Sequence, residues 1–289
     1  VTATGPETMV DTLGKTIVKP QYGGTYVTTS SVDIYGFDNM TTYPYLLSTV
    51  NQTNEPLVNG DWTKGPAGSN EISLQMTGVT FLQYSVGAIA ESWEVPDGQT
   101  IIYHIRKGIH FQNKPPVNGR ELTAKDVVFS LNRNFNTPTA YVAFTYKGAD
   151  APTSITATND WEVKITCNAG KQGPLFIVIS GYINIFPLEG AAADGTFKDW
   201  KTSNGTGPFI LSDYVPMSSS TVIKNPDYWR KDPLTGMQIP YIDIQRNLVI
   251  ADESTRIAGL QTGKIDSYMG VHWDSAESLI KTNPELLNG

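Results

Sequence analysis

The chain has 289 residues, 39% of them hydrophobic, and its 21 lysines and arginines are outnumbered by 28 aspartates and glutamates, for a net charge of -7. The hydrophobic share excludes a chain that is disordered for lack of core residues, and the acidic balance argues against a nucleic-acid binder, which needs cations for the phosphates. No apolar run approaches the roughly 20 residues that span a bilayer, and the single cysteine excludes an internal disulfide.

The N-terminal part is predicted to be a loosely ordered lead-in followed by the first strand. Residues 1–19 lack the basic start and apolar middle of a signal peptide, so we expect that any export signal has already been removed. Residues 1–22 are interpreted as the lead-in, which Gly23 and Gly24 end. Residues 25–29 then have the composition of a strand.

Three further segments alternate apolar and polar residues with the period of a half-buried strand. They are residues 101–106, 161–166 and 242–250. Before the first of them, Asp97-Gly98 is a pair typical of hairpin turns, so residues 93–106 are predicted to form a hairpin. Cys167 follows the second segment and is expected to be a small buried residue at a strand end.

Two helices are well marked. Thr123 and Asp126 form the pattern of a capping box before an apolar stripe that runs to Phe135. A second helix is predicted to start near Asp252, to turn Ile257 and Leu260 inward, and to stop at Gly263, because glycine is the usual residue just past a helix end. Residues 59–70 and 114–119 are predicted loops. The chain is therefore expected to be α+β, with β structure in excess.

The search for catalytic or metal-binding patterns predicts no enzyme and no cofactor. His104, His110 and His272 have no metal-binding spacing. Residues 278–281 match S-x-x-K, but the companion motifs of that pattern are missing. Residues 205–208, Gly-Thr-Gly-Pro, lack the lysine of a nucleotide-binding loop and are interpreted as a tight turn that needs glycine backbone conformations.

Several separated blocks of sequence share one feature, which is that they occur in the same order in one protein family. The blocks are residues 23–25, 90–98, 101–111, 118–130, 205–209, 225–229 and 252–266. In this order the chain resembles the peptide/nickel-type extracellular solute-binding proteins, family 5, which are the receptors of ABC importers for oligopeptides, dipeptides and nickel. The blocks are specific for the family and not for the cargo, because they are turns, caps and strand ends.

The resemblance implies the fold of a periplasmic-binding-protein-like lobe, a mixed β-sheet with flanking helices and an extra β-rich subdomain. Residues 1–45 and 167–270 are expected to form the main sheet domain, and residues 46–166 the extra subdomain. Members of the family are generally much longer than this chain. Residues 271–289 are therefore expected to start the crossover into a second lobe.

The resemblance also implies the function. The chain is expected to be the extracytoplasmic substrate-binding component of an ABC importer that captures peptides or a similar small solute. Its partners would be the ligand and the ABC permease and ATPase subunits, with no nucleic acid, and it would meet the membrane only through the permease or a removed lipid anchor. It would lie in the periplasm or at the cell surface. The alternatives are a nickel-chelate or oligosaccharide binder of the same fold, and a sensor or chaperone-like solute binder.

In the family, the loop after the first strand borders the ligand cleft. Asp33, in that loop, either neutralises the amino terminus of a ligand, since a buried ammonium needs a partner, or caps the loop itself. Other residues are further candidates for ligand contact. The full set is Ser30, Ser31, Val32, Asp33, Asn54 and Tyr146.

Overall fold

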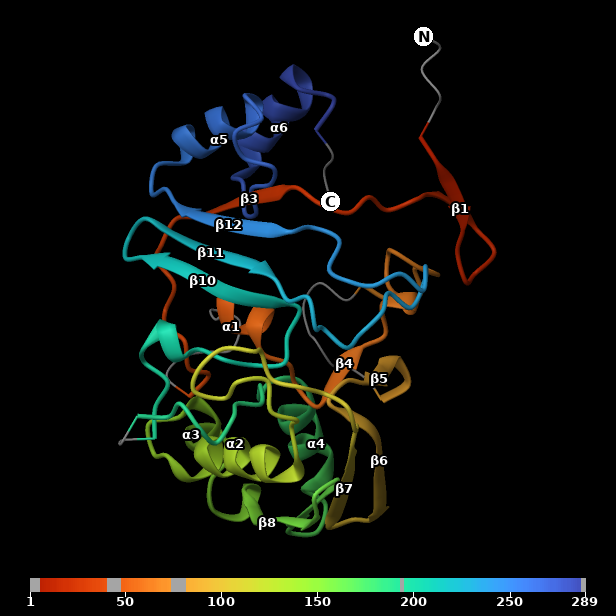
Figure 1. Cartoon of the computed structure of the whole chain (residues 1–289), viewed down its shortest axis with the longest axis vertical. Helices are drawn as coiled ribbons and strands as arrows, with labels where there is room; N and C mark the ends of the chain where they lie inside the picture. Colours follow the sequence, from red (N-terminus) through yellow and green to blue (C-terminus); the bar gives the residue numbers. More distant parts are fainter. Residues whose placement is uncertain (1–5, 41–47, 74–81, 193–194, 287–289) are drawn as a thin grey trace.

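The computed structural model describes residues 6–40, 48–73, 82–192 and 195–286, and two four-stranded sheets dominate it, one above the other in Figure 1. The first sheet has the order β10-β11-β12-β3, with β3 Thr25–Ser30, β10 Phe209–Val215, β11 Ser219–Lys224 and β12 Ile244–Val249. The second sheet has the order β6-β7-β9-β8, with β6 Ala90–Asp97, β7 Thr100–Ile105, β8 Pro152–Asn159 and β9 Glu162–Cys167. The predicted α+β class with a mixed sheet is confirmed.

Shorter elements surround the two sheets. The strands are β1 Thr8–Val10, β2 Thr16–Val18, β4 Val58–Gly60 and β5 Ser85–Gly87. The α-helices are α1 Ser48–Thr53, α2 Ala124–Asn136, α3 Tyr141–Thr145, α4 Gln172–Gly181, α5 Glu253–Gln261 and α6 Trp273–Thr282. Single 3-10 turns are η2 Trp62–Lys64, η3 Leu82–Tyr84, η4 Gly148–Asp150 and η5 Trp200–Thr202.

The first sheet brings the ends of two distant strands to one edge. Strand β3 pairs with β12 in parallel, from Thr25 opposite Ile244 to Ser30 opposite Val249. Strand β11 pairs with β12 antiparallel, so β11 begins at Ser219 where β12 ends. The predicted strands at residues 25–29 and 242–250 are both present in this sheet.

The N-terminal lead-in contains a hairpin that the sequence did not predict. Strands β1 and β2 pair antiparallel, with Met9 opposite Ile17. The turn between them is fixed to a distant loop, because Thr12 donates from its amide to the carbonyl of Leu234 (2.8 Å) and from its hydroxyl to the carbonyl of Pro233 (3.0 Å). Each strand has three residues, which is too short for a period-2 pattern to be recognised.

The largest hydrophobic core lies around the second sheet. The side chains of Ile101, Tyr103 and Ile105 on β7 are completely or almost completely buried, as the predicted alternation requires. Helix α2 covers this sheet, and α4 packs into the same core through residues that include Leu175 and Ile179. The division into domains stays a prediction, but α4 packs on the second-sheet side of the boundary expected at residue 167. Cys167 is buried at the end of β9, as predicted.

The two predicted helices begin and end where their capping residues indicate. The carboxylate of Asp126 accepts hydrogen bonds from the backbone N–H of Thr123 (3.0 Å) and from its hydroxyl (3.3 Å). The carboxylate of Asp252 accepts from the N–H of Thr255 (2.8 Å), and the helix ends before Gly263, whose φ is +65°.

The inward face of α5 differs from the prediction. Ile257 and Leu260 are only half-buried, whereas Arg256 is the buried residue of this helix. Helix α5 lies beside the edge strand β3 rather than over a face of the sheet (Figure 1). An edge offers backbone carbonyls more than apolar side chains, and the Arg256 guanidinium donates to the carbonyl of Ile250 (2.6 Å).

A buried polar network joins the two sheets. The side-chain amide of Asn54 donates to the carbonyls of Ile185 and Asn204, both at 3.0 Å. The side-chain amide of Gln112 donates to the carbonyls of Thr53 (3.1 Å) and Phe209 (2.8 Å). These side chains are at most about 1% exposed, so their polar groups need protein partners.

Glu55 is the charged member of this junction. Its carboxylate accepts from the hydroxyls of Thr206 (2.9 Å) and Tyr228 (2.7 Å) and from the indole N–H of Trp229 (2.9 Å). Burial raises the pKa of the Glu55 carboxyl, and these three hydrogen bonds offset only part of that rise. The blocks at residues 205–209 and 225–229 therefore meet at one carboxylate.

The turn at residues 205–208 needs glycine for a reason other than the predicted one. Neither Gly205 nor Gly207 has a positive φ. Instead, a Cβ on Gly207 would lie 2.6 Å from the carbonyl oxygen of Gln52, and a Cβ on Gly205 would overlap the carbonyl oxygen of Thr53. The glycines allow the turn to approach the backbone at the end of α1.

Candidate functional site

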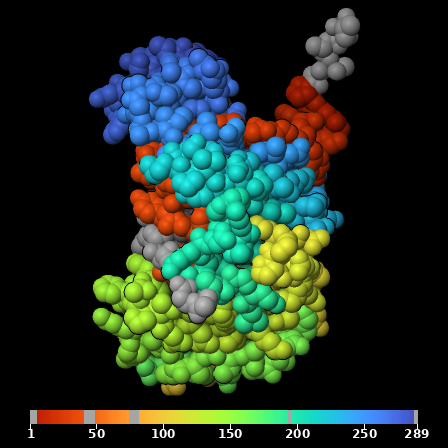
Figure 2. Space-filling view, turned by 60° about the vertical axis from the view of Figure 1, so that its left-hand side comes forward, coloured from red at the N-terminus to blue at the C-terminus, as the bar shows by residue number. Residues whose placement is uncertain are grey.

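Four segments meet at the edge where β3 and β12 end, and we call residues 30–33, 215–218, 250–252 and 267–270 the strand-end rim. The amide of Ile250 donates to the carbonyl of Ser30 (2.9 Å), and the amide of Val249 donates to Ser218 (2.8 Å). Thr28 forms a parallel bridge with Ser267, which carries the chain beyond Ser267 alongside the end of β3. The rim lies on the left of Figure 1, and Figure 2 turns that side toward the viewer.

The predicted loop after the first strand forms part of this rim. The hydroxyl of Ser30 donates to the carbonyl of Val32 (2.7 Å) and accepts from the side-chain amide of Asn247 (3.1 Å). Ser31 and Val32 are exposed. Four of the six predicted site residues therefore lie together, at the edge of the first sheet.

Asp33 fixes the turn between β10 and β11. Its carboxylate accepts from the hydroxyl of Tyr214 (2.7 Å) and from the backbone N–H groups of Met217 and Ile34, both at 2.8 Å. Partial burial raises the pKa of this carboxyl, but the three hydrogen bonds outweigh burial and the net pKa is lowered. These are the contacts of a loop-capping acid, and the ion pair with a ligand ammonium stays a prediction.

The structure does not bring Asn54 and Tyr146 to the rim. Asn54 is buried in the junction between the sheets, where its side-chain amide donates hydrogen bonds to two backbone carbonyls. Tyr146 follows α3 and packs against the core of the second sheet. Burial raises the pKa of the Tyr146 hydroxyl. The six predicted residues thus do not form one cluster.

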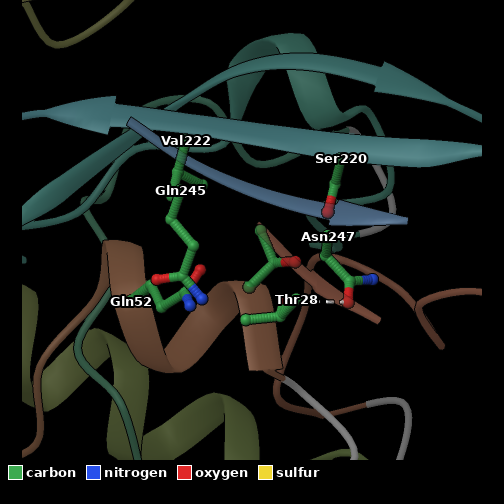
Figure 3. Close-up of a pocket in the computed structure, with 7 residues that line it drawn as sticks. Thr28, Gln52, Ser220, Val222, Gln245 and Asn247 are labelled. Carbon is green, nitrogen blue, oxygen red and sulfur yellow. Dashed lines mark hydrogen bonds between the residues drawn. The ribbon is translucent and has the colours of Figure 1, made fainter. Parts of the chain in front are cut away.

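A small polar pocket adjoins the rim between the first sheet and α1 (Figure 3). Its lining comes from three strands and the helix, and consists of Thr28, Thr49, Gln52, Ser220, Val222, Gln245 and Asn247. The volume is about 40 Å³, which is room for a few water molecules, because by this measure a cavity needs roughly 10–15 Å³ to hold one. The hydroxyl of Thr28 donates to Asn247 (3.2 Å), whose side-chain amide donates in turn to Ser30.

The sequence contains a pattern that could have predicted this pocket, namely polar residues on one face of the first sheet. Asn247 stands opposite Thr28 and Ser220, and Gln245 stands opposite Val222, so these polar residues share one face of the sheet. A face turned toward a helix is normally apolar. A run of amides and hydroxyls there indicates a neutral polar site for water or the head of a small polar group.

Within the described ranges no group of three or more histidines, cysteines, aspartates or glutamates could hold a metal ion. His104 lies between two carboxylates on the exposed face of the second sheet, with Nε2 2.9 Å from Glu94 and Nδ1 3.6 Å from Glu162. The acids are on opposite sides of the ring and cannot share one metal with it. In the same part of the chain, no helix is both long and apolar enough to span a membrane.

Comparison with known families identifies one match. The family model described as bacterial extracellular solute-binding proteins, family 5 Middle, matches residues 85–287. Among curated proteins, heme-binding protein A of Haemophilus influenzae is 30% identical over 199 residues, which are 62% of this chain and 34% of that protein. The oligopeptide-binding protein OppA of Bacillus subtilis is 27% identical over 59% of this chain and 32% of its own length. The chain spans about one third of the length of these relatives.

Solved structures share the fold. The periplasmic binding protein DppA of Helicobacter pylori, in complex with the peptide STSA, has a TM-score of 0.72 at 24% identity. The oligopeptide-binding protein AppA of Bacillus subtilis, in complex with a nonapeptide, has a TM-score of 0.70 at 23% identity. The match covers 91% and 92% of this chain, but only 50% and 47% of those structures.

Proposed function

This chain belongs to the bacterial extracellular solute-binding proteins of family 5, and on that premise we propose that it is the part of an ABC importer's substrate-binding protein that presents one wall of the ligand site. The cargo is a peptide or a similar small solute. The match over residues 85–287 carries this proposal. It is supported by relatives whose names state binding of oligopeptides and of di- and tripeptides.

The strand-end rim is the proposed ligand wall. Ligands of open sheets bind at the ends of strands, where loops from distant segments converge, and four segments converge here. Hydroxyl and amide groups at Ser30 and Asn247 offer neutral hydrogen-bonding partners for a peptide backbone. The mechanism is capture by closure of a second lobe over this wall, a hinge motion coupled to delivery.

The partners and the location follow from the same proposal. The protein works outside the cytoplasm and delivers its ligand to the permease and ATPase subunits of the transporter. It does not act as an enzyme, and the named relatives are binding proteins. Residues 271–289, which include α6, lead toward the second lobe.

Native mass spectrometry of the full-length protein, purified from its own host, tests the proposal. A co-purified peptide that is released on denaturation and rebinds in calorimetry is the expected result. A heme signal would instead favour the activity that the name of the Haemophilus relative states. Retention of a nickel chelate or an oligosaccharide would favour those cargoes. A protein that binds no solute would favour the chaperone-like role.

A further inference from the structure

The strand-end rim exposes apolar side chains from three of its four segments. Val32 is 50% exposed, Met217 is 71% exposed and Met269 is 89% exposed. The backbone N–H of Met217 donates a hydrogen bond to the carboxylate of Asp33, which is next to Val32. This bond brings two of the segments together. The bridge between Thr28 and Ser267 directs Met269 along the end of β3. Three apolar side chains from separate parts of the sequence thus line one edge.

The rim has no exposed lysine or arginine. Residues 20–63, 202–223, 247–255 and 265–280 contain none at all, although the chain has 21 such residues. Arg256 adjoins the rim but is only 7% exposed. Its guanidinium donates to the carbonyl of Ile250 (2.6 Å) and to the hydroxyl of Tyr268 (3.0 Å), and it stacks 4.8 Å from the Tyr268 ring centre. It is therefore not available to a ligand anion.

The charged groups on the rim itself and at the start of α5 are acidic, and the cations beside them lie off the rim. Lys198 lines a separate pocket with Ile34 and Tyr214, and His272 Nε2 lies 3.7 Å from the Glu253 carboxylate. Asp33 is held in place by three donors. Asp252 caps α5 and is exposed, and Glu253 accepts from the amide of His272 (3.2 Å). A carboxylate that enters such a surface loses its water without gaining a cationic partner and meets charges of its own sign.

From this arrangement we infer that the cargo contacts this lobe through apolar side chains and carries no acidic side chain there. The ligand class is an apolar peptide that is neutral or basic along its length. This inference rests on the proposed function, which it makes more specific. The inference concerns the side chains of the peptide and not its charged amino and carboxyl termini, which all linear peptides share.

Calorimetry on the full-length protein tests the inference with matched pentapeptides. The peptides share one backbone of alanines and differ only at the second, third and fourth positions, which are all leucine, all lysine or all aspartate. We expect the leucine peptide to bind best, and the aspartate peptide to bind at least tenfold more weakly than either of the others. Equal or tighter binding of the aspartate peptide would overturn the inference and leave the proposed function intact. If none of the three peptides binds to the folded protein, the peptide cargo of the proposed function is wrong and the inference falls with it.

A charge substitution locates the effect. Met217→Lys adds a cation at the rim, and Phe144→Lys adds one at a side chain on α3 of the same 71% exposure. We expect Met217→Lys to reduce the ratio of the affinities for the leucine and aspartate peptides by threefold or more. We expect Phe144→Lys to leave this ratio unchanged. Thermal unfolding checks that both variants are folded. Equal preferences in the two variants would overturn the assignment of the rim as the selecting surface.

Discussion

Asp33 links the proposed ligand wall to the stability of the protein. Replacement by alanine leaves the Tyr214 hydroxyl and the Met217 N–H without their acceptor. Because a lost hydrogen bond to a charged group costs about 1.5–3 kcal/mol, we expect Asp33→Ala to lower the free energy of unfolding by about that amount. Urea unfolding measures it, with Val32→Ala as the control, since an exposed neighbour usually changes stability by less than about 0.5 kcal/mol.

The pH dependence of the same residue has a definite sign. The pKa of Asp33 in the folded protein is lowered from 3.8, so its carboxylate stabilises the fold above that value, and this contribution is lost as pH falls through the lowered pKa. The stability difference between wild type and Asp33→Asn should therefore shrink as the pH falls below about 4. A difference that stays constant down to acid unfolding would contradict the hydrogen-bonded carboxylate.

Glu55 should behave in the opposite way. Its pKa is raised by burial, so the protonated form is favoured on folding. That contribution is fully present below 4.5, the pKa without burial, and is lost as pH rises through the raised pKa. Glu55→Gln removes this titration, and wild type should gain stability relative to Glu55→Gln as the pH is lowered.

The pair Glu55→Gln and Glu55→Ala separates charge from hydrogen bonding. Glutamine keeps an oxygen acceptor for Thr206 and Trp229, and the Tyr228 oxygen can accept from its amide. Alanine leaves three donors without a partner. Because each unsatisfied buried group costs about 1–3 kcal/mol, we expect Glu55→Ala to cost at least about 3 kcal/mol more than Glu55→Gln in urea unfolding. Equal losses would show that the junction does not depend on these bonds.

Asp33 and Glu55 differ in how well the sequence alone predicts their importance. Asp33 was predicted because the family resemblance places the loop after the first strand at the ligand cleft. Glu55 was not predicted, because its partners Thr206, Tyr228 and Trp229 lie more than a hundred residues away in sequence. No local pattern marks a carboxylate whose donors come from other segments. Asn54, its neighbour, was predicted as a ligand contact and lies in the same junction.

At the scale of single elements, helix α2 offers a test of its N-terminal cap. The carboxylate of Asp126 accepts from the N–H and the hydroxyl of Thr123 and is also paired with Arg120 (2.7 Å). We expect Thr123→Ala to lower the free energy of unfolding by about 1 kcal/mol, the usual value of a helix cap. Thr123→Ser keeps the hydroxyl and serves as the control. An unchanged urea midpoint in the alanine variant would mean that the hydroxyl contributes nothing.

The turn at residues 205–208 offers a sharper test. A Cβ on Gly207 would lie 2.6 Å from the Gln52 carbonyl oxygen and from the Thr53 carbonyl carbon, so even Gly207→Ala should cost about 3 kcal/mol, at the upper end for overpacking. Gly98 lies in the turn between β6 and β7, and the nearest atom is 4.0 Å from its Cβ position. Gly98→Ala should therefore be neutral or stabilising by up to about 1 kcal/mol. Similar unfolding temperatures for the two variants would contradict the close approach of the turn to α1.

The elements that the sequence predicted are those with long patterns or strong punctuation. Helix α2 and strands β7 and β9 are each specified by several residues in register. Hairpin β1–β2 was missed because three-residue strands have no measurable period. The inward face of α5 was mistaken because an apolar period assumes a sheet face as neighbour, whereas this helix meets an edge and turns Arg256 toward backbone carbonyls.

At the scale of the whole molecule, the two sheets form one body because polar groups from five segments meet between them. Several contacts are made at this junction. They are the close approach of the turn at residues 205–208 to the end of α1, the hydrogen bonds of the Asn54 and Gln112 side-chain amides, and those of the Glu55 carboxylate. The rim lies outside this junction, at the far end of β3 and β12. A change of side chain at the rim is therefore expected to leave this junction intact.

Residues 1–289 on their own present only one wall of the proposed ligand site. The peptide-bound structures that share this fold are about twice as long as the part this chain matches, and in the proposed mechanism a second lobe closes over the rim and adds further contacts. A peptide on one open wall keeps one side in water and loses hydrogen bonds on the other, which only an opposing lobe replaces. We therefore expect residues 1–289 to fold but to bind no peptide tighter than about 1 mM, which is about -4 kcal/mol. The full-length protein should bind its cargo in the micromolar range or better. Calorimetry of both proteins with the same peptides decides this, and micromolar binding by residues 1–289 would show that the rim and its polar pocket are a complete site.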